Sequence, residues 1–222
     1  SPHDAEQPWG EDVGGTEAVL AELRAHGADA VATASDFADR RAPADVVDAT
    51  RAKYGHLDAV VAAHARSSHQ SIEQVTAAEI DRTYAVNTRA TLLLVQRFAA
   101  EHDGRAGGRV VLFTSGQHHE AMPAELPYVA SKAALHQLTP SLAVALAAKR
   151  ITVNCVDPGP TDTGAHLPEE LRDRIASRIP LGRWGRPSDA ARLVAWLMSD
   201  EAEWVTGQVI ASDGGWSARS RV

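Results

Sequence analysis

Three side chains between positions 115 and 132 combine a hydroxyl, a phenol and an amine at spacings that suit acid/base chemistry. Tyr128 and Lys132 are four positions apart, so in a helix that begins near Pro127 both side chains share one face, one turn apart. An ammonium close to a phenol favours the phenolate, and it lowers the tyrosine pKa from its ordinary value of about 10. Ser115 follows the apolar run 110–113, at the end of a predicted strand, where ligands bind on open parallel sheets. A Tyr-x-x-x-Lys pair is also a common pattern on helix surfaces, so context has to decide between the two readings.

The elements that position these side chains alternate between helix and strand, which predicts an α/β fold. Apolar periodicity, glycine stops and β-branched runs mark the boundaries. Pro140 lies well inside the helix that carries Lys132 and predicts a kink or break, at a cost of ~3 kcal/mol if unrelieved. The expected helices are 16–27, 43–55, 76–102, the one from about 127 and the one capped by Ser188. The expected strands are 28–39, 57–63, 110–113, 151–156 and the last, near Val209.

Composition describes one soluble domain. The chain has 222 residues, of which 44% are hydrophobic and 23% charged, and no run of eighteen apolar residues suggests a membrane span. We therefore expect a cytoplasmic protein. The net charge of −7 argues against a nucleic-acid partner, because phosphate binding needs a basic face. The single Cys155 lies in an apolar run and is expected to be a buried structural thiol, and no residues are assigned to a metal.

Together with Ser115, Tyr128 and Lys132, the downstream run NCVDPGPTDTG from Asn154 resembles the short-chain dehydrogenase/reductase family. The resemblance implies a Rossmann-like doubly wound parallel sheet with helices on both faces, formed by residues 1–222 as a single domain. It also implies that Tyr128 exchanges a proton with the substrate oxygen, which Ser115 holds. Lys132 would lower the tyrosine pKa and bind the nicotinamide ribose.

Further positions take their roles only from this resemblance. Asn87, in the run AVNTRA, matches an asparagine that holds a proton-relay water, although a buried amide is also a common structural hydrogen-bonder. Asp36 matches an acidic residue that meets the adenine, and it reads equally as a solvated turn residue. The strand end Ala62-Ala63-His64-Ala65 stands where the family has Asn-Asn-Ala-Gly. The expected cofactor-binding residues are Asp36, Phe37, Ala63, His64, Tyr128, Lys132, Pro158, Gly159, Thr161 and Thr163.

Some of these residues have plain alternatives. His64 also fits a partly exposed polar residue at a strand end, and Thr161 and Thr163 also fit a turn and an N-cap. Residues 164–187 have helical periodicity between flexible ends and are expected to form a lid over the substrate. His118, His119 and Met122 are expected at its entrance.

The phosphate-binding loop of a dinucleotide fold has no match in the sequence. The run Gly10-x-x-x-Gly14-Gly15 has no apolar strand before it, and Glu11 and Asp12 inside it would repel a pyrophosphate. The chain is therefore expected to begin just past the second strand of the fold, which leaves strand 28–39 without a neighbour.

Two classes of function follow. The first is an NAD(P)-dependent oxidoreductase that interconverts a ketone and a secondary alcohol and resembles 3-oxoacyl-carrier-protein reductases, with NADP favoured over NAD. The second is a catalytically silent binding or regulatory relative, which the missing glycine-rich loop and the altered strand end favour. The predicted helix 76–102 is apolar on all sides around 92–95, which suggests a subunit interface. With the C-terminal strand near Val209 as a second contact, we expect a homotetramer.

Overall fold

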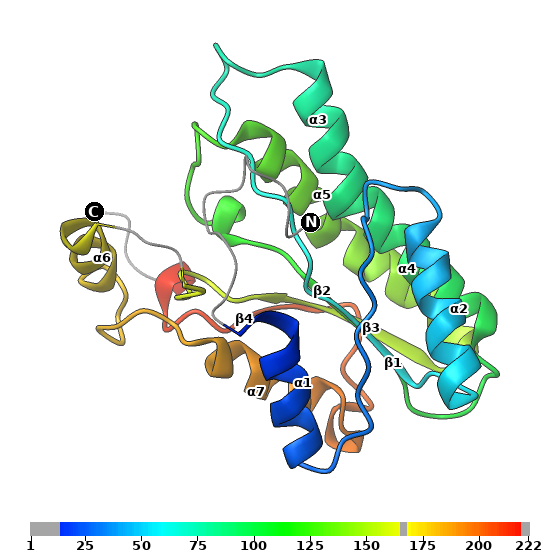
Figure 1. The fold of residues 1–222 in the computed structure, drawn as a ribbon. Coiled ribbons are helices and arrows are strands. Elements are labelled where there is room, and N and C mark those ends of the chain that lie inside the picture. Colours follow the sequence, from blue (N-terminus) through cyan, green and yellow to red (C-terminus); the bar gives the residue numbers. More distant parts are fainter. Residues whose placement is uncertain (1–13, 165–167, 219–222) are drawn as a thin grey trace.

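A parallel sheet of four strands forms the centre of the molecule (Figure 1). The computed structural model describes residues 14–164 and 168–218. The strands lie in the order in which the chain makes them: β1 (Ala59–Ala62), β2 (Gly108–Phe113), β3 (Ile151–Asp157) and β4 (Val209–Ala211). Because all four run the same way, the loops that follow β1, β2 and β3 emerge at one edge of the sheet.

Helices cover both faces of this sheet, and the period of two along the strands decides which side chain meets which helix. Val110 and Leu112 face the layer that holds α4 (Ala90–Glu101) and α5 (Leu126–Leu146). Val111 and Val156 face α7 (Pro187–Leu197) on the other side. The α/β prediction with a helix-flanked parallel sheet is therefore confirmed.

The predicted helix 76–102 is one continuous element with a widened turn in its middle. It begins as α3 (Ala77–Tyr84), where the Thr76 hydroxyl accepts a hydrogen bond from the Glu79 backbone N–H. A π-helical turn, Ala85–Arg89, joins α3 to α4 and contains Asn87. Single π turns inside α-helices are frequent at functional sites. α2 (Ala42–Tyr54) packs on α4, and an ion pair of 2.7 Å joins Arg97 Nε to the Asp48 carboxylate.

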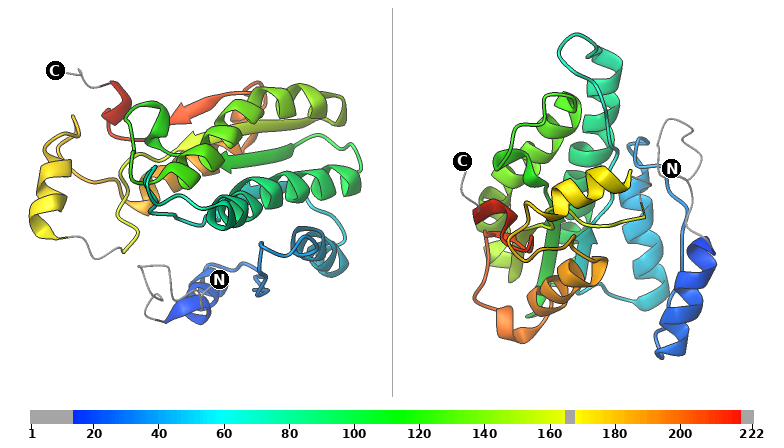
Figure 2. Two further views of the ribbon diagram at one scale, coloured as in Figure 1. Left: turned by 90° about the horizontal axis from the view of Figure 1, so that it is seen from above. Right: turned by 90° about the vertical axis from the view of Figure 1, so that its left-hand side faces the viewer.

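The predicted strand 28–39 does not form. Residues 28–35 connect α1 (Gly15–Ala25) to a turn at 36–39, and no strand of the described residues pairs with them. A strand needs a neighbour for its backbone N–H and C=O groups. Here no strand in the part of the chain that the structure describes lies beside the segment, and residues 31–36 are exposed. The Asp29 and Ala30 carbonyls accept hydrogen bonds from the side chains of Tyr54 and Arg24. Figure 2 shows α1 and this connection at the periphery of the molecule.

Two smaller expectations also need correction. α5 continues through Pro140 without a break, so the lost hydrogen bond is tolerated inside one helix. The N-cap of α7 lies two residues earlier than predicted, at Arg186 instead of Ser188, and the Asp189 carboxylate accepts the Arg186 backbone N–H at 2.7 Å.

The remaining helical elements are short. None of the helices in the described ranges is both long and apolar enough to cross a bilayer. The remaining short elements are α6 (Glu169–Ala176) and the 3-10 turns Gly116–His118, Ala147–Lys149, Asp200–Ala202 and Trp216–Ala218.

Candidate active site

A cavity of about 850 Å³ opens at the carboxyl edge of the sheet, between the ends of β1 and β2, the first turns of α5 and one face of α7. Its volume is in the range of small-molecule and cofactor sites. Six of the residues singled out from the sequence line it: Ala63, Tyr128, Lys132, Pro158, Thr161 and Thr163.

Tyr128 lies in the first turn of α5 and lines the cavity, and the Ser115 hydroxyl is among the neighbours that act on the pKa of its phenol. The structure thus places Ser115 and Tyr128 near each other across the β2–α5 loop, and their roles stay predictions. Burial raises the pKa of Tyr128 above its ordinary value, and the Ser115 hydrogen bond opposes this shift. The direction is opposite to the lowered pKa that the Tyr-x-x-x-Lys spacing led us to expect.

Lys132 does not offset the effect of burial on the Tyr128 pKa, because its ammonium is directed at the strand and not at the phenol. Its side chain is 2% exposed, and the ammonium donates to the Phe113 carbonyl at the end of β2 at 3.0 Å. The Nζ atom lies 6.0 Å from the centre of the Tyr128 ring, so the two groups do share one helix face as predicted. Burial lowers the pKa of Lys132 to about 8. The lysine is thus a desolvated cation held against the strand, one turn below the phenol.

Asn87 is fully buried, and described residues satisfy its whole amide. Its Oδ1 accepts the Arg66 backbone N–H at 2.6 Å, and its Nδ2 donates to the Arg66 carbonyl and to the Ser131 hydroxyl, each at 2.9 Å. Asn87 therefore ties the segment after β1 to the turn of α5 that precedes Lys132.

His64, just past the end of β1, contacts the π-helical turn that contains Asn87. Its Nε2 lies 3.1 Å from the Val86 carbonyl, and its ring packs edge-on against Phe37 with centroids 4.5 Å apart. Burial, aided by the charge of Lys132, lowers the pKa of His64 to about 4, so the imidazole is neutral at physiological pH. Neither His64 nor Phe37 lines the cavity, so their roles toward a cofactor stay predictions.

Asp36 lies away from the cavity, in an exposed turn. Its carboxylate accepts the Ala38 backbone N–H at 2.9 Å, as in an Asx turn. Its role toward an adenine stays a prediction.

The loop after β3 approaches the C-terminal turn closely at Gly159. This residue has φ 58°, and a Cβ on it would lie 2.4 Å from the Cβ of Asp213. Thr161 donates to the Pro158 carbonyl at 2.9 Å, which keeps its hydroxyl at the cavity wall.

We expect Gly159→Ala to lower the free energy of unfolding by about 2 kcal/mol, since a methyl group has no room there and the residue has a left-handed conformation. Urea unfolding followed by circular dichroism measures this. Gly55→Ala is the matched control: its φ is 84° and its Cβ would meet nothing within 4 Å, so the backbone cost alone remains. An equal loss of stability in both variants would contradict the close approach.

The sequence did not single out the helix that closes the cavity. Residues of α7 supply a smooth apolar wall, and Thr114 and Phe113 continue it from β2. The helical spacing of the small residues in α7 is the signal that would have found it. The α7 residues of the wall are Pro187, Ala190, Ala191, Val194 and Ala195.

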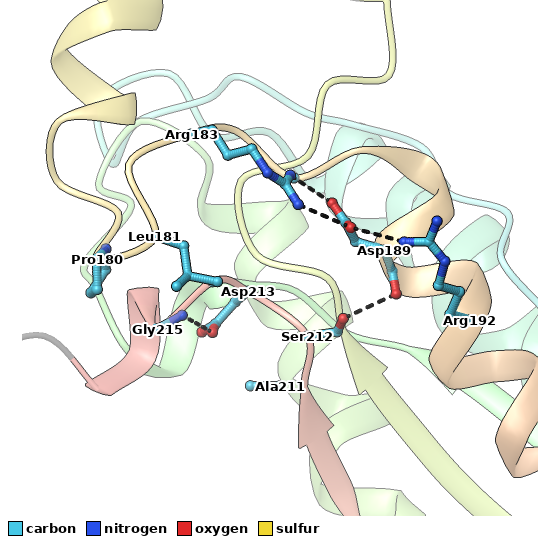
Figure 3. A pocket seen from close by; sticks show the side chains of 11 residues that line it. Pro180, Leu181, Arg183, Asp189, Arg192, Ala211, Ser212, Asp213 and Gly215 are labelled. Carbon is cyan, nitrogen blue, oxygen red and sulfur yellow. Dashed lines mark hydrogen bonds and ion pairs between the residues drawn. The ribbon is translucent and has the colours of Figure 1, made fainter.

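A second hollow of about 540 Å³ lies between α7 and the C-terminal turn (Figure 3). Arg183 and Arg192 both pair with Asp189 in it, and Ser212 donates to the Asp189 carbonyl. None of the residues assigned from the sequence to catalysis or cofactor binding lines this hollow.

Comparison with known proteins identifies the group to which these features belong. Residues 11–217 match the family model described as enoyl-(acyl carrier protein) reductase. A protein of Bacillus subtilis described as the uncharacterized oxidoreductase YjdA is 37% identical over 209 residues, which are 93% of this chain and 83% of that protein.

Solved structures agree with this sequence similarity. The crystal structure of a putative short-chain alcohol dehydrogenase from Sinorhizobium meliloti superposes with a TM-score of 0.88 at 30% identity, covering 95% of this chain and 85% of the other. The angucycline C-6 ketoreductase LanV, solved with bound NADP, gives a TM-score of 0.84 at 29% identity, covering 91% and 81%.

Proposed function

Because the chain belongs to the short-chain dehydrogenase/reductase family, and is therefore an NAD(P)-dependent oxidoreductase acting between ketones and alcohols, we propose that Tyr128 is its acid and base. The observation that carries the proposal is the Tyr128 phenol at the cavity, with the Ser115 hydroxyl acting on its pKa and the buried Lys132 ammonium one turn away. A substrate carbonyl oxygen between the two hydroxyls accepts a hydrogen bond from each.

The raised pKa of Tyr128 gives the proposal a direction. A phenol that stays protonated at neutral pH is ready to donate its proton to a ketone oxygen, so the ligand-free protein is set for reduction. Asn87 acts as a positioning residue, since its three hydrogen bonds hold the turn of α5 that precedes Lys132.

The residues around the cavity fit the nicotinamide end of the coenzyme. Lys132 offers an ammonium for ribose hydroxyls, and Thr161 and Thr163 offer hydroxyls for a carboxamide or a phosphate. Ala63 and Pro158 leave apolar wall for a flat ring. The coenzyme, when bound, supplies or accepts the hydride. We propose NADP over NAD, supported by the NADP bound in LanV; comparing initial rates with NADPH and NADH tests this choice.

For the substrate we propose a 3-oxoacyl thioester, as for 3-oxoacyl-carrier-protein reductases, because the alanine-rich face of α7 suits an acyl chain beside the reacting carbonyl. A cyclic ketone is the second candidate, since the angucycline ketoreductase LanV is similar over 91% of the chain. NADPH oxidation with one substrate of each kind separates them. A protein that binds NADPH and turns over neither class would favour the catalytically silent alternative.

We also propose that residues 1–222 form one domain, that the protein is cytoplasmic, and that it assembles as a homotetramer. The assembly rests on Leu92 and Leu93, which are only partly buried in α4, and on the short edge strand β4. We expect light scattering at micromolar concentration to give four times the chain mass. A monomer at that concentration would contradict this prediction.

A further inference from the structure

Two histidines and one buried aspartate meet at the carboxyl edge of the sheet, beside the loop that carries Ser115. His118 and His119 come from the 3-10 turn after β2 and the residue that follows it, and Asp157 is the last residue of β3. One ligand atom from each side chain lies within 4.8 Å of the other two. We propose that His118, His119 and Asp157 bind a divalent transition-metal ion of the zinc class, which links the Ser115 loop to the end of β3.

The distances suit such an ion. Two ligands that are each about 2.0–2.2 Å from a tetrahedral zinc lie about 3.4 Å apart. The Nε2 of His119 lies 3.4 Å from Asp157 Oδ2, and the Nε2 of His118 lies 3.8 Å from it. A small adjustment of the two rings brings all three atoms to bonding distance of one centre.

The carboxylate supports a bound cation over a plain hydrogen-bonded pair. Asp157 is 1% exposed, its Oδ1 accepts the Gly159 backbone N–H at 3.0 Å, and its Oδ2 receives no hydrogen bond from the described residues. A buried carboxylate oxygen without a donor is costly unless it is neutralised. A metal ion supplies this neutralisation at Oδ2.

The other ring nitrogen of His118 is oriented as in known metal sites. Its Nδ1 lies 3.1 Å from the Ser115 carbonyl, which can only accept, so Nδ1 carries the proton. The lone pair is then on Nε2, the atom that faces Asp157. A backbone carbonyl that fixes the tautomer of a ligating histidine is a common supporting contact.

Neighbouring groups limit the site to these three protein ligands, with one position open. Asp213 is near, but its carboxylate accepts the backbone N–H of Gly215 at 2.9 Å (Figure 3) and that of Ser217 at 2.7 Å. The His136 ring packs at a tilt against the His118 ring, with centroids 4.5 Å apart, and a water takes the open fourth position. Side-chain exposures of 28% for His118 and 23% for His119 give an ion access from solvent.

The test is a titration of the full, chelator-treated chain with Zn²⁺ in competition with a chromophoric chelator. We expect one high-affinity equivalent per chain in the wild type and at least a tenfold weaker affinity in each of His118→Asn and Asp157→Asn, since the first loses an imidazole ligand and the second loses the negative charge of the carboxylate. Circular dichroism checks that the variants fold. Should Asp157→Asn not fold, His118→Asn at the surface decides alone.

The matched control is His56→Asn, which removes a histidine from an exposed His–Asp pair with 3.2 Å between Nε2 and the Asp58 carboxylate. It should bind Zn²⁺ as the wild type does. Substituted Co²⁺ adds a second readout, because four-coordinate cobalt gives intense visible absorption that the Asp157→Asn variant should lose. Absence of a stoichiometric Zn²⁺ equivalent in the wild type, or unchanged affinity in both ligand variants, would overturn the proposal.

Discussion

Tyr128→Phe should lower kcat for ketone reduction by about 10²- to 10⁴-fold, the usual contribution of a positioned general acid. The change removes only the phenol oxygen, so the cavity keeps its shape and the Lys132 ammonium keeps its bond to the Phe113 carbonyl. Coenzyme affinity should therefore stay within about threefold of the wild type. Steady-state kinetics with saturating NADPH measures the first quantity, and nicotinamide fluorescence measures the second.

The control for this variant is Tyr84→Phe. Tyr84 ends α3, is 40% exposed and does not line the cavity, so its change should leave kcat unaltered. A Tyr128→Phe protein with near wild-type kcat would show that the proton comes from another group, and the proposed role of Tyr128 would be wrong.

Lys132→Met should weaken coenzyme binding and slow turnover together, because in the proposed site one ammonium serves both the ribose and the reacting centre. We expect at least a tenfold loss in coenzyme affinity, which is about 1.4 kcal/mol, and a further drop in kcat. In the ligand-free protein Lys132 bonds Phe113 and not the phenol, so the loss in kcat should appear without a large change in the pKa of free Tyr128.

The same variant should be more stable than the wild type. The pKa of Lys132 is lowered from 10.5 to about 8 because burial disfavours the ammonium. Between pH 8 and 10.5 the unfolded state holds the proton that the folded state has released, so the free energy of unfolding of the wild type rises with pH in this range. Below pH 8 the full cost of burying the charged ammonium, ~3 kcal/mol, remains. Methionine avoids the penalty but loses one hydrogen bond, so we expect a net gain of about 2 kcal/mol at pH 7.

Guanidinium unfolding of wild type and Lys132→Met at pH 7 and at pH 10 tests this expectation. The gain in the free energy of unfolding of the variant should be smaller at pH 10. Lys149→Met is the matched control: Lys149 donates to the Ala99 carbonyl outside the cavity, and its change should leave coenzyme affinity and kcat unaltered. A Lys132→Met protein with wild-type affinity and rate would contradict its place in the site.

Local sequence patterns predicted the fold where an element carries its own signal. The apolar runs 110–113 and 151–156, and the glycines and prolines that bound the helices, predict elements close to those observed. The strand expected at 28–39 failed because strand formation depends on a neighbour, and sequence propensity in one segment says nothing of whether that neighbour lies beside it. Pro140 predicts a break from local helix geometry alone, whereas α5 packs along β3, a tertiary contact that no local rule includes.

The sequence predicts those parts of the site that depend on spacing within one helix or at one strand end. Tyr128 and Lys132 share a face because they are four apart in one helix, and the strand end places Ser115 next to them. The sign of the Tyr128 pKa shift was wrong, since it depends on burial and on the Phe113 carbonyl that takes up the Lys132 ammonium. His118 and His119 lie 39 and 38 positions before Asp157, and this spacing does not predict that they meet. They meet because β2 and β3 are neighbours in the sheet.

The most direct test of the central claim is a nicotinamide-fluorescence titration of the wild-type chain with NADPH, run beside Lys132→Met. If the cavity between Tyr128, Lys132 and Thr161 holds the coenzyme of an oxidoreductase, the wild type gives a saturable fluorescence change at micromolar protein, and the variant gives a curve displaced at least tenfold to weaker binding. A wild-type titration that does not saturate, or two superimposable curves, would contradict it.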